Sequence, residues 1–190
     1  MDVFMNLAIF PLPVYLLPGG ITRLRIFEQR YLKMVKEAAS GDGFVISLHR
    51  EGNEFNISDW GSWVHIIDFQ HGDDGLLYID VQCQDLVRIG TVERDQDKLL
   101  HGDVQVCEHW PVQQANDDTQ LLGEELNKFF DANPTYASLY PDPDFGSPVW
   151  VCGRWLELIP INYEKKRCFI HPDSFSKAIN FLSTVIIEKT

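Results

Sequence analysis

Short apolar runs separated by polar turns fill roughly the first 110 residues of the chain. Many of these runs are rich in β-branched and aromatic side chains, which is typical of strands rather than helices. Strands are therefore predicted at residues 6–10, 21–26, 44–48, 63–69, 76–81, 86–89 and 104–107. An aspartate and glycine cluster at residues 72–75 joins two of them and predicts a hairpin. So many short strands at close intervals indicate a barrel-like or sandwiched sheet.

One segment in this half has helical spacing instead. Between residues 28 and 39, apolar side chains recur at i, i+3, i+4 and i+7 and form one stripe. These side chains are Tyr31, Met34, Val35 and Ala38. Gly41 follows as a plausible stop.

The prolines near the amino terminus predict a segment that leaves the sheet. Proline cannot donate a ladder hydrogen bond, so Pro11 and Pro13 limit pairing of residues 10–13. Pro18, Gly19 and Gly20 then predict a tight turn. We expect a stiff apolar edge before that turn, lying outside the ladder.

The second half of the chain predicts helices. Leu122, Leu126, Phe129 and Phe130 share one helical face after an acidic start at residues 117–118. Ser147 followed by Pro148 favours a helix start, and Pro160 ends that helix. A short helix is predicted from about residue 163, and a last one after an Asp173 cap, with its stripe continuing to the carboxyl end. The boundaries expected are a β-rich domain at 1–110 and a helical domain at 111–190.

The negative net charge of the chain disfavours two classes of binding partner, nucleic acids and anionic membranes. The chain of 190 residues has 28 acidic and 16 basic side chains and a formal net charge of −12. Binding of nucleic acid or of an anionic membrane surface relies on clustered lysine and arginine, so neither is expected. The absence of a long apolar run and of a signal peptide's basic start indicates a cytoplasmic protein. Four cysteines with apolar neighbours and no CxxC pair predict buried free thiols.

The sequence contains no recognisable catalytic or ligand-holding motif. It lacks the GxxxxGK[ST] phosphate loop, a GxSxG elbow and an HExxH metal motif. Asp73 and Asp74 lie in a predicted turn, where aspartate is favoured for local backbone bonding. We therefore predict no catalytic residue, no metal site and no cofactor.

Two stretches carry a family resemblance. Residues 9–20, IFPLPVYLLPGG, and residues 24–31, LRIFEQRY, strongly resemble the opening of the Lon protease amino-terminal, substrate-binding domain family. Residues 61–89 resemble the family's hairpin ending in an arginine, although the glycine usual before that arginine is replaced near Cys83. Residues 155–161, WLELIPI, resemble a later helical motif. We identify the chain as a member of this family, of a stand-alone bacterial type.

The resemblance implies an α+β fold: a PUA-like, six-stranded β pseudo-barrel subdomain followed by a helical bundle. It also implies a role in binding polypeptide segments, without the ATPase and Ser–Lys peptidase domains of Lon. The binding surface is expected near the junction of the subdomains, at six residues of the opening motif. These residues are Phe10, Leu12, Phe27, Glu28, Arg30 and Tyr31. The alternative is that the motif only builds the fold and that its apolar side chains are core.

Three functions are compatible with the sequence. The first is a non-catalytic module that captures unfolded or hydrophobic protein segments, or acts as an adaptor for proteolysis. The second is a hydrolase-type enzyme that uses a cleft between the subdomains for a small molecule. The third is a PUA-like RNA binder, which would need a basic face around Arg23, Arg25, Arg30 and Lys33. The sequence does not predict the oligomeric state.

Overall fold

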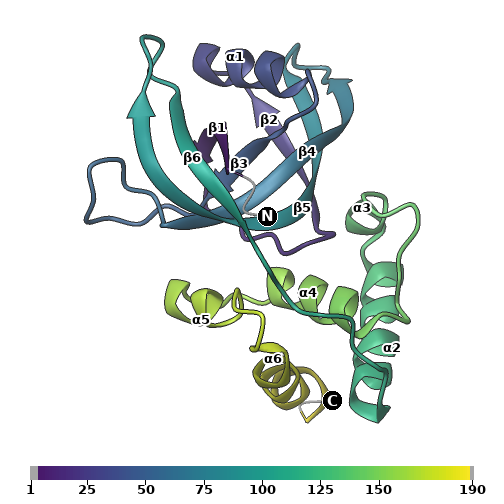
Figure 1. Ribbon diagram of the computed structural model, residues 1–190. Coiled ribbons are helices and arrows are strands. Elements are labelled where there is room, and N and C mark those ends of the chain that lie inside the picture. Colours follow the sequence, from purple (N-terminus) through teal and green to yellow (C-terminus); the bar gives the residue numbers. More distant parts are fainter. Residues whose placement is uncertain (1–3, 189–190) are drawn as a thin grey trace. The chain divides into compact units, whose positions relative to one another are not determined.

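The computed structural model describes residues 4–188, and the chain divides into two compact units, Met1–Cys107 and Glu108–Thr190 (Figure 1). The first unit contains every strand and one α-helix, and the second contains the other helices. Each unit is described separately below.

Six strands form the sheet of the first unit. They are β1 (Phe4–Pro11), β2 (Ile21–Ile26), β3 (Phe44–Ser47), β4 (Trp60–His71), β5 (Leu77–Arg94) and β6 (Leu100–Cys107). Their order is β2-β5-β4-β3-β1-β6, and β6 pairs with β5 as well. Five strands therefore close into a ring, and β2 adds to it as a sixth. The structure confirms the α+β class and the barrel-like sheet.

The 18 residues of β5 make this closure possible. Residues 77–82 pair with β2, while residues 86–94 pair with β6, so two different neighbours share one edge of β5. The prediction of separate strands at 76–81 and 86–89 is therefore wrong. Cys83–Asp85 continue the strand because β4 pairs with β5 across them, apart from a register shift at Trp63 and Val64.

The opening motif lies in the sheet more fully than its prolines predict. Pro11 is the last residue of β1 and pairs in parallel with Ser47 of β3, and the N–H of Leu12 donates to the Ser47 carbonyl at 3.0 Å. Proline is tolerated at the end of the strand, where its missing N–H leaves no gap in the ladder. The expectation that this segment lies outside the ladder is wrong. The turn that follows is as predicted: Gly20 donates to Leu17, with Gly19 at φ 85° as a type II turn requires.

Helix α1 (Gln29–Ala38) lies across one opening of the barrel (Figure 1). Its buried residues are the predicted stripe of Tyr31, Met34, Val35 and Ala38. Lys33 holds α1 to the turn after β5 through Asp95 and Asp97, with N–O distances of 2.7 and 2.6 Å. The pKa of Asp95 is lowered, chiefly by the hydrogen bond from Lys33.

The second unit consists of helices. They are α2 (Asp117–Ala132), α3 (Pro134–Ala137), α4 (Pro148–Leu158), α5 (Tyr163–Cys168), α6 (Phe175–Leu182) and a π-helical segment η1 (Ser183–Ile187). Asn116 caps α2 reciprocally with Thr119, and Ser147 caps α4 as predicted. The cap of α6 is Ser174, not Asp173, and the hydroxyl of Ser174 instead accepts from Trp110 Nε1 at 2.8 Å. The last apolar stripe is interrupted because η1 changes the helical period after Leu182.

A buried ion pair lies inside the second unit. Nε and Nη2 of Arg154 donate to the two carboxylate oxygens of Glu157 at 2.7 and 2.8 Å. The side chains are 0% and 6% exposed, and the rings of Tyr140 and Trp150 lie 5.9 and 5.4 Å from the guanidinium. Such a pair is stable in a protein interior only when its partners satisfy both charges.

Across residues 4–188, no helix has the length and apolar content required to cross a bilayer. The four cysteines are free, and Cys83 and Cys152 are buried as predicted. Burial raises the pKa of the Cys152 thiol to about 12. Cys168 is exposed, which corrects the prediction for that residue, because it ends the short helix α5 on a turn facing solvent.

Candidate functional site

Two of the six motif residues proposed to bind a ligand are buried in the first unit. Phe10 and Tyr31 are 6% and 8% exposed, and their ring centroids lie 3.9 Å apart with an interplanar angle of 32°. This contact joins β1 to α1. Burial also raises the pKa of the Tyr31 hydroxyl. In this conformation neither ring offers much surface to a ligand.

Glu28 and Arg30 lie beside the buried Phe10–Tyr31 pair and are partly exposed. Nε of Arg30 donates to Glu28 Oε2 at 2.9 Å, and the guanidinium lies 4.7 Å from the centre of the Tyr31 ring. Arg30 also reaches the carbonyl of Lys98 at 3.5 Å. Glu28 is the N-cap residue of α1 but makes no capping hydrogen bond through its side chain. The pair therefore holds the start of the helix in place.

Leu12 and Phe27 stand apart from that cluster. Leu12 is half-buried after the end of β1, whereas Phe27 follows β2 with 63% of its surface exposed. The structure thus brings four of the six residues together and leaves Phe27 as the one most accessible to a partner. A binding role for the set stays a prediction.

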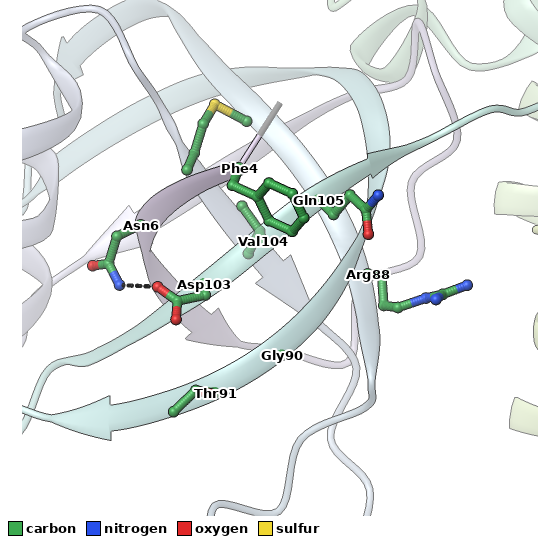
Figure 2. Close-up of a pocket in the computed structure, with 9 residues that line it drawn as sticks. Phe4, Asn6, Arg88, Gly90, Thr91, Asp103, Val104 and Gln105 are labelled. Atoms are coloured by element: carbon green, nitrogen blue, oxygen red, sulfur yellow. Dashed lines mark hydrogen bonds between the residues drawn. The ribbon is translucent and has the colours of Figure 1, made fainter. Parts of the chain in front are cut away.

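A shallow depression of about 430 Å³ lies on the outer face of the barrel (Figure 2). It is lined by Phe4, Met5, Asn6, Arg88, Gly90, Thr91, Asp103, Val104 and Gln105. Phe4 is 70% exposed, and Asn6 donates to Asp103 at 2.8 Å across the β1–β6 pair. A register shift between Ile89 and Val92 opens β5 here, and Gly90 adds no side chain.

The far end of β4 has a second exposed apolar surface. Ile67 and Phe69 are 48% and 51% exposed, whereas Trp60 and Val64 on the same strand are buried. Sequence reasoning missed both this surface and Phe4. The alternation of β4 predicts a strand, but it does not predict how far β3 pairs along it. Only the extent of that pairing shows which residues of β4 have no neighbour on this side.

Four basic residues of the first unit, Arg23, Arg25, Arg30 and Lys33, do not form a free basic face. The four residues that an RNA-binding surface would need each make an ion pair within 4.0 Å. The pairs are Arg23–Asp80, Arg25–Asp74, Arg30–Glu28 and Lys33 with Asp95 and Asp97. The hydrogen bond from Arg23 to Asp80 is bidentate and raises the pKa of the arginine. Their charge is locally balanced by carboxylates, which weakens the attraction for phosphate.

No group of three or more metal-ligating side chains occurs in residues 4–188. His109, the histidine with a shifted pKa in that range, donates from Nε2 to the Phe169 carbonyl at 2.8 Å. Burial lowers its pKa, so it is neutral near pH 7 and serves as a structural donor in the second unit.

Both the sequence and the fold show similarities to those of known proteins. The family model of the ATP-dependent protease La (LON) substrate-binding domain matches residues 6–169. The crystal structure of a Lon N-terminal domain protein from Xanthomonas campestris is 25% identical, with a TM-score of 0.72 over 95% of this chain and 98% of that one. The N-terminal domain of the Mycobacterium avium complex Lon protease is 13% identical, with a TM-score of 0.64 over 95% and 97% of the two chains. Curated protein sequences include no match.

Proposed function

Because the chain belongs to the LON substrate-binding domain family, a family of non-catalytic modules related to proteolysis, we propose that it is a cytoplasmic module that captures unfolded or hydrophobic polypeptide segments. In this role it either holds such segments or delivers them to a protease as an adaptor. It acts without a cofactor and without catalysis of its own.

The observation that supports this role is the apolar surface of the first unit. Four of its large apolar side chains are exposed: Phe4, Phe27, Ile67 and Phe69. Single exposed apolar residues are ordinary, but Ile67 and Phe69 lie close together in the sequence of β4, and adjacent exposed apolar residues mark an interaction surface. Ile67 and Phe69 are both exposed near the end of the same strand, although a register shift at Ile67 interrupts the regular alternation between them.

The alternatives have less support. RNA binding would require the paired basic residues to exchange their carboxylate partners for phosphates, in a chain whose net charge is −12. For a hydrolase, we identify no nucleophile beside a base among the described residues. We therefore propose neither.

The direct test is fluorescence anisotropy of a labelled, natively unfolded casein titrated with the protein. We expect saturable binding at micromolar concentration, and a folded globular protein of similar size with the same label serves as the control. Absence of binding to casein at tens of micromolar contradicts the proposed function.

A further inference from the structure

The two halves of β4 differ in their neighbours. Ser62–Val64 pair with β3 on one side and β5 on the other, because β3 begins at Phe44 opposite Val64. From Asp68 to His71 the strand pairs with β5 alone, Ile67 lies at a register shift without a partner in register, and all five residues are exposed. Within residues 4–188, no backbone hydrogen bond joins this stretch to any strand except β5. The second half of β4 is therefore an open sheet edge.

An open edge presents unpaired backbone donors and acceptors at alternate residues, and these are a template for an added strand. Natural proteins commonly block such edges with lysine or proline, or cover them. Neither residue type occurs between Ile67 and His71. The edge is instead apolar at two positions.

We propose that the Ile67–His71 edge of β4 binds an extended polypeptide segment as an additional strand. This inference rests on the proposed function and specifies how and where the segment is held. The backbone of β4 supplies sequence-independent hydrogen bonds, which suits a module that must accept many unfolded chains.

The side chains beside the edge define the preferred segment. Leu24, Ile79 and Phe69 are in register across β2, β5 and β4, so they share one face of the sheet. Leu24 and Ile79 are buried, and Phe69 continues their row out of the core. An apolar residue on the added strand would extend this row and cover Phe69.

The charge at the edge favours a basic residue in the same segment. Asp80 holds the guanidinium of Arg23 through two hydrogen bonds, and the charge of Asp68 also helps to raise the pKa of that arginine. Two carboxylates therefore lie beside one guanidinium here. The exposed Asp68 carboxylate leaves an excess of negative charge beside the edge. A segment that alternates apolar with basic residues matches both features.

Asp68 also satisfies one backbone donor of this edge when no segment is bound. Its Oδ1 accepts from the N–H of Phe69 at 2.8 Å, which occupies a donor that an added strand would use. The register shift beside Ile67 limits the regular part of the edge further. A second copy of this acidic chain would bring like carboxylates together, so self-pairing is disfavoured while a basic segment is attracted.

The first experiment measures casein anisotropy with Phe69→Lys and with Phe4→Lys as a matched control. Both replace an exposed phenylalanine of a strand in the same unit by the same side chain. We expect Phe69→Lys to weaken binding by about tenfold or more and Phe4→Lys to change it by less than about twofold. The reverse pattern overturns the inference in favour of the depression in Figure 2.

The second experiment tests the backbone. A short peptide of alternating valine and lysine competes with labelled casein, and its twin is methylated on alternate backbone nitrogens. The twin keeps every side chain but lacks the donors on one edge. We expect the first peptide to displace casein, the register that methylates the nitrogens facing β4 to compete less well, and a peptide methylated at every backbone nitrogen to fail. Equal competition by the twins overturns strand addition.

The outcomes separate the inference from the proposed function. If casein binds but neither the Phe69→Lys variant nor backbone methylation matters, the module captures polypeptides elsewhere. If casein does not bind at all, the proposed function fails together with the inference. A concentration-dependent dimer that Phe69→Lys abolishes, in place of peptide binding, assigns the edge to a second copy and overturns the inference.

Discussion

The two units treat their aromatic side chains differently. In the second unit, Phe130, Tyr140 and Trp150 pack against one another with ring centroids 5.6 to 6.0 Å apart, and Tyr140 and Trp150 also enclose Arg154. In the first unit, Phe4, Phe27 and Phe69 are more than half exposed. Two of these three rings of the second unit pack beside an internal ion pair, whereas these three rings of the first unit remain open to a partner, although others such as Phe10 and Tyr31 are buried.

This difference separates a structural role from an interaction role. Substituting the enclosed residues should change the free energy of unfolding, because each removes packing or leaves a charge without water. Substituting the exposed residues should leave unfolding almost unchanged and act on binding. Four substitutions test the contrast, from the largest expected effect on stability to the smallest.

Glu157→Ala should have the largest effect. The variant leaves the Arg154 cation buried without its bidentate partner and also opens a void, so we expect a loss of about 4 kcal/mol or more in urea unfolding. The matched control is Glu125→Ala, which breaks another i,i+3 pair, with Lys128, whose side chain is 70% exposed. That control should show no resolvable change. Equal losses in the two variants contradict the contrast.

Trp155→Ala should cost roughly 3–5 kcal/mol, the usual range for emptying a buried large aromatic position. Trp155 is 8% exposed, and its Nε1 donates to the Leu122 carbonyl at 2.9 Å, which joins α4 to α2. Trp155→Phe keeps most of the packing without the donor and should lose less. A loss below about 1 kcal/mol in Trp155→Ala would show that the two helices pack without this ring.

Elements with a clear period could be predicted from the sequence. The stripe from Tyr31 to Ala38 identifies α1, and Ser147 with Pro148 identifies the start of α4. Both signals are local, since a helix satisfies its backbone within a few residues of sequence. The Arg30–Glu28 pair was predictable for the same reason.

Features that depend on distant neighbours could not be predicted. The continuity of β5 through Cys83–Asp85 depends on β4, and the exposure of Phe69 depends on where β3 begins. Arg154 and Glu157 have the spacing of a surface pair, and only the packing of the second unit shows that they are buried. The predicted division at residue 110 into separate domains, and the ligand-binding role of the opening motif, stay predictions.

His109 should make stability depend on pH, with a smaller effect than either core substitution. Burial lowers its folded pKa below the ordinary value of 6.5, so its contribution is fully present above about pH 6.5 and is lost as pH falls from there through the lowered folded pKa. We expect wild-type protein to lose stability between about pH 7.5 and pH 5.5 in urea unfolding. In His109→Gln, which keeps a donor for the Phe169 carbonyl, the slope should be shallower. If the free energy of unfolding depends on pH identically in the wild type and in His109→Gln, then His109 has the same pKa in the folded and unfolded states.

Phe27→Ser should have the smallest effect on stability. Phe27 follows β2, where Ile26 pairs with Leu77 of β5, and 63% of its surface is exposed, so little packing is lost. We expect the free energy of unfolding to change by less than about 0.5 kcal/mol. Phe10→Ser, at a buried ring of the same motif, should instead destabilise the first unit strongly. Casein anisotropy with Phe27→Ser then decides whether the motif contacts a segment directly.

Phe27 lies at the same end of the sheet as the open edge of β4, because Ile26 pairs with Leu77 and Leu77 pairs with His71. Weaker binding in a fully folded Phe27→Ser variant would extend the binding surface across that end, whereas unchanged binding would leave the motif a purely structural part of the first unit.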